Sequence, residues 1–264
     1  MTDAAKLNLR IENLSVEFDG VSILDSVSFS VARGDVVGLI GPNGAGKSTA
    51  LRASLGLVER TKGQVRAGAV DVSFLQPRDR AKLMSYVPQG APVHWPLTAE
   101  RTVALGRVPH LNPWQDLSTK DEKAVEDAMR KTDCWDFRSR LVTTLSGGER
   151  SRVLLARSLA VGASYILADE PTASLDPMHQ LQVMDILRVE AAAGAGVLVV
   201  IHDLAHAMRF CDKLVLLDGG KLVASGAPNE VLTDDNLRSA FGIEVTRWDN
   251  GGFQYLVPSR VVEE

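Results

Sequence analysis

A glycine-rich segment at residues 41–49 has the residue types and spacing of a phosphate-binding loop. It matches the pattern G-x-x-x-x-G-K-[ST], follows the apolar run Val36–Ile40 and precedes a helical pattern. Its members are Gly41, Pro42, Asn43, Gly44, Ala45, Gly46, Lys47, Ser48 and Thr49. Glycines let backbone N–H groups turn towards phosphate oxygens, and a helix N-terminus adds its positive dipole end. We therefore predict a nucleotide site in which Lys47 reaches the β- and γ-phosphates and the Ser48 hydroxyl binds Mg²⁺.

An acidic pair ends the apolar segment Tyr165–Ala168. Asp169 is placed to hold Mg²⁺, directly or through a water, and Glu170 is placed to polarise an attacking water. On its own, an acidic pair at the end of a strand is usually a solvated turn or a helix cap. With a phosphate loop upstream, we interpret the pair as part of a hydrolytic site.

The sequence Leu145-Ser-Gly-Gly-Glu149 stands before a predicted helix at Arg150–Ala160. Its serine and glycines form a second helix start suited to an anion. Because one phosphate loop already accounts for a bound triphosphate, this second site needs another explanation.

This combination of motifs resembles the ABC-type ATPases, in which LSGGQ from one subunit closes over ATP held by the other. The resemblance implies that Ser146, Gly147 and Gly148 contact the nucleotide of a partner copy. Glu149 departs from the family pattern, which has glutamine there. We expect little loss of activity from this change, although a carboxylate near ATP could weaken nucleotide affinity.

Further family positions follow in order and extend the resemblance over residues 9–258. Phe18 resembles the aromatic residue that stacks on adenine, its alternative being an ordinary core residue. Gln89 matches the glutamine that senses Mg²⁺ and faces a membrane partner, and Ser174-Leu-Asp176 matches the loop that communicates between the two sites. His202 matches the histidine that contacts the γ-phosphate. The catalytic set implied is Glu170, His202, Gln89 and Lys47, with Ser48, Gln89 and Asp169 around the metal.

These residues require an α/β framework to position them. Continuous apolar runs at residues 36–40, 165–168, 197–201 and 214–217 alternate with helical segments, which predicts a mainly parallel sheet covered on both faces. The alternating segment Leu9–Phe18 and the turn at Asp19-Gly20 predict an antiparallel β subdomain. We expect one phosphate-loop ATPase domain over residues 1–264, with its core in 1–77 and 162–242. A helical subdomain is expected at 78–161, with a helix at Thr119–Thr132 capped by Ser118, and a hairpin extension at 243–264.

Composition limits the alternatives. The formal net charge is −4, which argues against a nucleic-acid-binding surface. Cys134 and Cys211 form no metal-binding pattern and are expected to be reduced thiols. We find no secretory signal and no apolar run near the roughly 18 residues that span a bilayer. The expected location is therefore peripheral, on the cytoplasmic face of the inner (plasma) membrane.

Three function classes contain a phosphate loop of this kind: a transport ATPase with a separate permease, a soluble ABC-type protein acting on DNA or ribosomes, and a phosphate-loop kinase or GTPase. The LSGGE segment and the absence of an N-K-x-D motif argue against the third class. The second usually has a coiled-coil insertion, zinc-binding cysteines or two nucleotide domains. The stretch Glu100–His110 contains VALGRVPH and resembles ATPases of iron-siderophore, haem and cobalamin importers. This resemblance implies a homodimer with two permease subunits and a periplasmic or extracellular substrate-binding protein. The alternative is a permease for another small nutrient or a metal ion.

Overall fold

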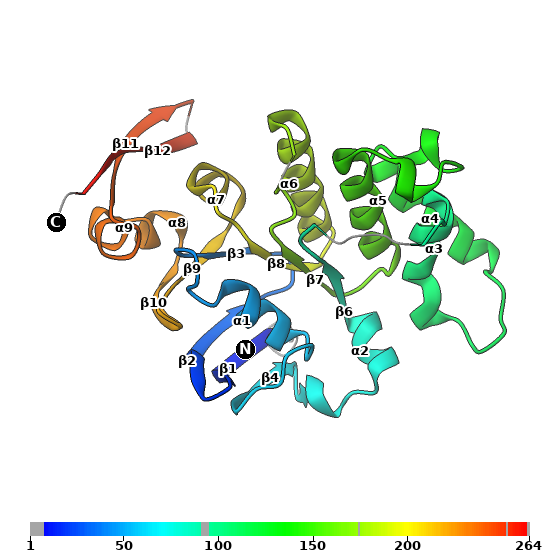
Figure 1. The fold of residues 1–264 in the computed structure, drawn as a ribbon, viewed down its shortest axis with the longest axis horizontal. Coiled ribbons are helices and arrows are strands. Elements are labelled where there is room, and N and C mark those ends of the chain that lie inside the picture. The colour runs from blue at the N-terminus through cyan, green and yellow to red at the C-terminus, as the bar shows by residue number, and fades with distance from the viewer. Residues whose placement is uncertain (1–7, 91–94, 174, 252, 263–264) are drawn as a thin grey trace.

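A computed structural model of the chain describes residues 8–90, 95–173, 175–251 and 253–262. Its centre is a six-stranded sheet in the order β10-β9-β3-β8-β7-β6 (Figure 1). The strands are β3 (Val36–Ile40), β6 (Met84–Val87), β7 (Tyr165–Asp169), β8 (Gly196–Val200), β9 (Lys213–Asp218) and β10 (Lys221–Gly226). Neighbouring strands are parallel except β9 with β10. The predicted α/β fold with a mainly parallel sheet is confirmed.

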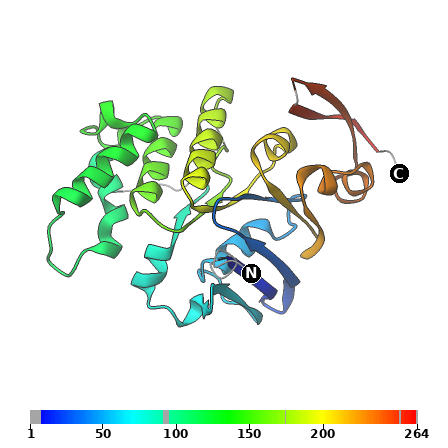
Figure 2. The ribbon, with the colours of Figure 1, turned by 180° about the vertical axis from the view of Figure 1, so that it is seen from behind.

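Both faces of this sheet are covered, which explains the continuous apolar runs in the sequence. Every residue of β3, β7 and β8 is buried. Alternate residues of β3 enter different cores: Val37 and Leu39 pack with the N-terminal strands, and Val36 and Ile40 pack on the opposite face. The first core also contains α1 (Lys47–Ser54), and the second contains α6 (Pro177–Ala192) and α7 (Leu204–Phe210). Figure 2 shows the same layers from behind.

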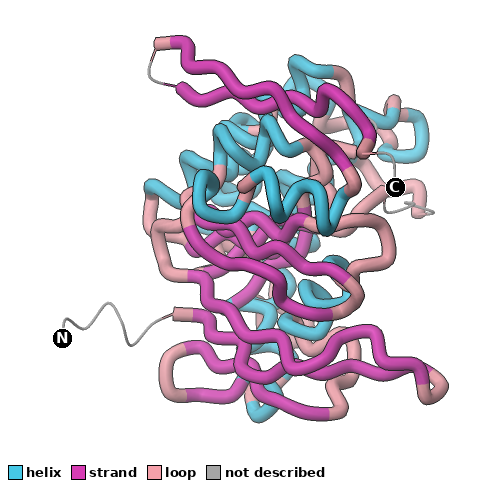
Figure 3. Tube along the Cα trace, turned by 90° about the vertical axis from the view of Figure 1, so that its left-hand side faces the viewer, coloured by secondary structure: helices cyan, strands magenta, loops and turns pink. Residues whose placement is uncertain are grey.

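An antiparallel sheet lies against one face of the core in the order β2-β1-β4-β5 (Figure 3). Its strands are β1 (Leu9–Phe18), β2 (Val21–Val31), β4 (Lys62–Ala67) and β5 (Val70–Asp71), which leads into the 3-10 helix η2 (Val72–Phe74). Phe18 pairs with Val21 across the turn predicted at Asp19-Gly20. The predicted antiparallel β layer is therefore present, although the sequence did not reveal β4 and β5.

The middle of the chain is mostly helical and has a core of its own. Its elements are α2 (Pro77–Leu83), α3 (Ala99–Ala104), η3 (Leu105–His110), α4 (Thr119–Lys131), η4 (Trp135–Phe137), η5 (Val142–Thr144) and α5 (Gly147–Ala160). Val103, Met129 and Val153 are fully buried where α3, α4 and α5 meet. Ser118 and Asp121 form the predicted capping box at the start of α4.

One element lies outside the predicted pattern. Met84–Val87 forms β6, the edge strand of the six-stranded sheet, although it falls inside the range predicted as helical from residue 78. A run of four partly apolar residues is too short to show the period of a strand or a helix. The division of the chain into subdomains stays a prediction, although β6, inside the range assigned to the helical part, belongs to the six-stranded sheet.

The chain ends in α8 (Pro228–Val231), α9 (Asp234–Phe241) and the predicted hairpin, formed by β11 (Ile243–Asn250) and β12 (Phe253–Val261). Leu256 anchors the hairpin because its side chain is fully buried in the core that contains α7. Cys134 and Cys211 are buried free thiols. Within the described residues, no helix is long and apolar enough to cross a membrane.

Candidate functional site

The phosphate loop connects β3 to α1, as the sequence predicted. Gly46 closes the loop with a backbone φ of +93°, and a Cβ there would stand 2.6 Å from a methyl carbon of Leu24. Only glycine combines that conformation with so little space. The buried Lys47 ammonium donates hydrogen bonds of 2.8 Å to the carbonyl oxygens of Gly41 and Pro42. Burial lowers the pKa of Lys47, with Glu170 and Asp169 acting in the opposite direction.

Two of the three predicted metal-binding residues, Ser48 and Asp169, come from separate elements and are in contact. The Ser48 hydroxyl, at the start of α1, donates a 2.7 Å hydrogen bond to Oδ1 of Asp169, the last residue of β7. The Asp169 side chain is fully buried. A hydroxyl and a carboxylate are ligands that Mg²⁺ accepts when nucleotide phosphates complete its shell, so the donor set fits this ion.

Glu170 stands between Gln89 and His202, two of the other predicted catalytic residues. Its Oε1 lies 2.5 Å from Nε2 of His202, and its Oε2 accepts a 2.5 Å hydrogen bond from the Gln89 amide. Gln89, Glu170 and His202 follow β6, β7 and β8, so all three stand at the carboxyl edge of the parallel strands, where such sheets bind ligands. Glu170 has a left-handed backbone with φ of +48°. Such strain persists only where surrounding structure imposes it, and it gathers at functional sites.

A cleft of about 310 Å³ brings part of the phosphate loop together with Glu170 and His202, two of the predicted catalytic residues. Its lining includes Asn43, Gly44, Gly46, Lys47, Ser48, Thr49, Glu170 and His202. Among the described residues, Phe18 does not line this cleft. Its side chain is half exposed at the end of β1, and this exposure does not fit the alternative of a core residue. The roles of all these residues stay predictions.

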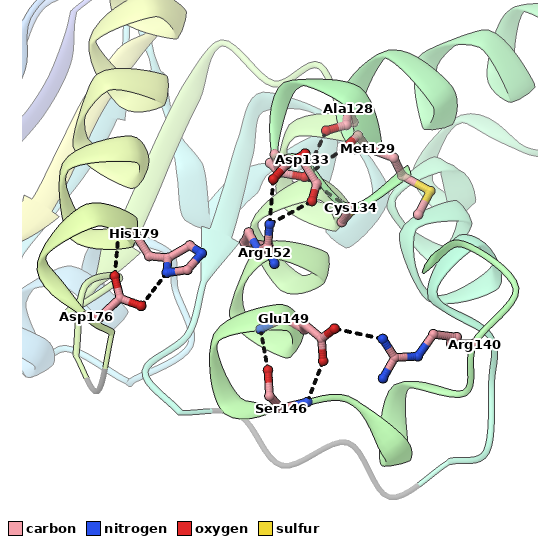
Figure 4. A network of polar contacts seen from close by, with 11 residues as sticks. Ala128, Met129, Asp133, Cys134, Arg140, Ser146, Glu149, Arg152, Asp176 and His179 are labelled. Carbon is pink, nitrogen blue, oxygen red and sulfur yellow. Dashed lines mark hydrogen bonds and ion pairs between the residues drawn. The ribbon is translucent and has the colours of Figure 1, made fainter. Parts of the chain in front are cut away.

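The LSGGE segment lies apart from this cleft. Ser146 caps α5, and neither it nor Gly148 lines the phosphate-loop cleft among the described residues, while Gly147 lines a separate cavity with Gln89 and Glu170. Glu149 completes a capping box: its Oε2 accepts a 2.8 Å hydrogen bond from the Ser146 backbone N–H (Figure 4). Its Oε1 forms a 2.7 Å ion pair with the Arg140 guanidinium. These contacts, the Ser146 N–H first, lower the pKa of Glu149.

The predicted communicating loop is only partly described, since Ser174 lies outside the described residues. Leu175 is buried, and Asp176 caps α6 by accepting a 3.0 Å hydrogen bond from the backbone N–H of His179. The Nδ1 atom of His179 lies 2.6 Å from the same carboxylate (Figure 4). This loop therefore leads directly into the first turn of α6.

Sequence reasoning missed two residues next to Asp169. Arg52 donates a 2.9 Å hydrogen bond to Oδ2 of Asp169, and the Tyr86 hydroxyl lies 3.4 Å from the same oxygen. Arg52 follows Ser48 by four residues, and residues four apart share one face of a helix. That spacing was the signal available in the sequence. Tyr86, on β6, had none, because the strand itself was not predicted.

The VALGRVPH motif closes around the C-terminal end of α5. Arg107 donates 2.8 Å and 2.7 Å hydrogen bonds to Asp121 and to the carbonyl oxygen of Ala160. His110 Nε2 lies 2.8 Å from the carbonyl oxygen of Val161. Gly106 allows the close approach, because a Cβ there would stand 2.3 Å from the Arg157 carbonyl oxygen. These contacts satisfy carbonyl groups that a helix end leaves without partners.

Comparison with known proteins identifies the family to which the chain belongs. The family model described as ABC transporter matches residues 24–173, which include the phosphate loop, the LSGGE segment and the acidic pair. The chain belongs to the ABC transporter family. Its fold agrees: a chain from a structure described as an inward-facing metal-chelate type ABC transporter superposes with a TM-score of 0.83 at 25% identity, over 96% of this chain and 98% of that one.

Curated members of the ABC transporter family give a similar result. A cobalamin import ATP-binding protein of Halobacterium salinarum is 43% identical over 240 residues, which cover 90% of this chain but only 60% of that protein. A hemin import ATP-binding protein of Pseudomonas fluorescens is 38% identical, over 90% of this chain and 93% of that protein. A dimeric ATP-binding cassette solved with ADP and Pi superposes with a TM-score of 0.75 at 26% identity, over 84% of this chain and 99% of that one. The family resemblance inferred from the motifs is confirmed.

Proposed function

We propose that this chain binds Mg²⁺-ATP and hydrolyses it as the energy-supplying subunit of an ABC importer. The observation that carries the proposal is the position of Glu170, which lines the phosphate-loop cleft while Gln89 and His202 hold its two oxygens. A carboxylate in that position can accept a proton from a water that attacks the γ-phosphate. The metal, when bound, neutralises phosphate charge. Ser48, Asp169 and Gln89 would hold it, and Lys47 and His202 would contact the phosphates.

We infer further that two copies of the chain form the working unit. Ser146, Gly147 and Gly148 begin a helix whose N–H groups suit a phosphate, yet this helix start is separate from the phosphate-loop cleft. A second copy would bring its helix start to the nucleotide held by the first. The exposed Phe18 would stack on adenine. The pair would then hold two ATP molecules, one in each composite site.

A mixing experiment tests composite sites. A Lys47→Ala subunit has a damaged phosphate loop, and a Ser146→Arg subunit has a damaged helix start. Each variant alone leaves every composite site with one defect, whereas a mixed dimer has one intact site and one site with two defects. Partial ATP binding should therefore return on mixing. Absence of recovery at all mixing ratios, with mixed dimers confirmed by differential tagging, would contradict the composite site.

The cargo follows from the relatives, which are named for cobalamin and hemin import. We propose that two copies act with two permease subunits and a periplasmic or extracellular substrate-binding protein, on the cytoplasmic face of the inner (plasma) membrane. The complex would import a bulky iron chelate, haem or cobalamin, with a permease for another small nutrient or metal ion as the alternative. Gene deletion followed by uptake of radiolabelled haem, ferric siderophore and cobalamin tests this. Normal uptake of all three without a redundant system would reject the cargo and leave the ATPase proposal intact.

A further inference from the structure

The two oxygens of Asp169 are held by two residues on one face of α1. Oδ1 accepts a 2.7 Å hydrogen bond from Ser48, and Oδ2 accepts a 2.9 Å hydrogen bond from Arg52 one turn later. The Asp169 side chain is fully buried, whereas 44% of the Arg52 side chain is exposed. The carboxylate expected to hold Mg²⁺ is therefore paired with a cation that reaches it from the solvent side.

A buried carboxylate is costly unless a charged partner compensates it. Lys47 does not form that ion pair in this structure, because its ammonium is hydrogen-bonded to the carbonyl oxygens of Gly41 and Pro42. Arg52 does. The Arg52 guanidinium also reaches the Tyr86 hydroxyl at 3.4 Å, so β6 contributes to its placement. Tyr86 stands three residues before Gln89.

We propose that Arg52 is a substitute counter-ion, which neutralises Asp169 when the metal is absent and is driven off it when Mg²⁺ binds. The inference rests on the proposed Mg²⁺-ATPase function. A guanidinium and Mg²⁺ beside one carboxylate repel each other. Because almost half of the Arg52 side chain is already exposed, it can turn to water without a large conformational change. Its pairing with Asp169 lowers the affinity of the site for Mg²⁺ and promotes release of the ion with the product.

A substitute counter-ion and a simple positioning residue lead to opposite changes in Mg²⁺ affinity when Arg52 is removed. If Arg52 only oriented Asp169 for the metal, its removal would weaken Mg²⁺ binding. As a substitute counter-ion it stabilises the metal-free state more than the metal-bound state. Its removal must then lower the stability of the metal-free protein and strengthen Mg²⁺ binding, because it raises the free energy of the metal-free native state more than that of the metal-bound native state.

The test is a Mg²⁺ titration of the full chain at saturating ADP, in which the unfolding temperature is measured at each Mg²⁺ concentration. This measurement requires no ATP hydrolysis. Arg52→Gln should lower the half-saturating free Mg²⁺ concentration by about tenfold, and lower the unfolding temperature in EDTA. Arg52→Lys should fall between Arg52→Gln and wild type. Arg188→Gln is the matched control, because Arg188 is 43% exposed and pairs with Asp212 at the surface. It should titrate like wild type.

A half-saturating Mg²⁺ concentration for Arg52→Gln that equals or exceeds those of wild type and Arg188→Gln would overturn the inference. Should Arg52→Gln be too unstable to purify, the same comparison with Arg52→Lys decides the question. If the wild-type protein itself shows no Mg²⁺-dependent stabilisation by ADP, the proposed Mg²⁺-ATPase function fails first, and the inference fails with it. The two failures are thus distinguishable.

Discussion

The His202 Nε2 atom lies 2.5 Å from one oxygen of Glu170 while the Gln89 amide holds the other. Each carboxylate oxygen can accept two hydrogen bonds, so each oxygen keeps one acceptor position for a water. Gln89 and His202 therefore orient the Glu170 carboxylate without occupying it fully. Because they follow β6 and β8, the two neighbours of β7, they hold Glu170 from both sides.

Replacement of Glu170 by glutamine should retain ATP binding and slow hydrolysis by at least about a hundredfold, the effect of losing a general base. Steady-state phosphate release and ATP-induced dimerisation measure the two properties. Glu149→Gln is the matched control, because it makes the same chemical change outside the phosphate-loop cleft. A folded Glu170→Gln protein that releases phosphate near the wild-type rate would remove Glu170 from this role.

Glu149, the departure from the family pattern, should be nearly neutral. Its charge is paired with Arg140, and glutamine at this position can also complete a capping box. Glu149→Gln should change the free energy of unfolding by less than about 1 kcal/mol and ATP affinity by less than about twofold. Arg140→Gln leaves the carboxylate without its cation and should weaken ATP-induced dimerisation. Tenfold tighter ATP binding by Glu149→Gln would show that Arg140 does not offset its charge.

The Arg107–Asp121 pair should give the protein a specific sensitivity to acid. Hydrogen bonds from Ser118 and Arg107 lower the pKa of Asp121 to about 2, against about 3.9 in an unfolded chain. A lowered folded pKa means that this carboxylate stabilises the native state above about pH 4 and loses that contribution as the pH falls towards 2.

Asp121→Asn should therefore lower the unfolding temperature most near pH 6, and the gap to wild type should narrow steadily below pH 4. Asp127→Asn on the same helix is the control, because Asp127 is half exposed and pairs with Lys123 at the surface. A gap between Asp121→Asn and wild type that stays constant down to pH 2 would contradict the pKa direction.

Gly106→Ala should destabilise the helical part of the chain by about 1–3 kcal/mol, the usual cost of overpacking. The added methyl group would meet the Arg157 carbonyl oxygen at 2.3 Å, which is backbone and cannot rotate away. Gly147→Ala is the control for this stability measurement, because a Cβ there meets nothing within 4 Å. Urea unfolding of both variants gives the comparison, and equal midpoints would show that η3 can move away from α5.

The sequence predicts which residues gather at the carboxyl edge of the parallel strands, and the reason is physical. The phosphate loop, Glu170 and His202 each follow an apolar run long enough to identify as a buried strand, and parallel strands bring their carboxyl ends together. Gln89 was found by resemblance only, because β6 has four residues and no clear period. The four-residue spacing places Arg52 on the same helix face as Ser48, but its contact with Asp169, 117 positions away, is encoded by no local pattern. β4, with glycine and polar residues, lacks the alternation that reveals a half-buried strand.

Gly106, Arg107 and His110 pack against and hydrogen-bond to the end of α5. These contacts limit where two members of this family can be joined in a hybrid protein. The VALGRVPH motif, on which the cargo proposal draws, contacts α5 of its own chain. Its residues and the helix capped by Ser146 should therefore move together. A chimaera that takes residues 99–110 from one relative and 147–161 from another would combine two surfaces from different proteins, and the hydrogen bonds and packing between them could be lost. Crossovers placed before residue 99 and after residue 161 keep this joint intact.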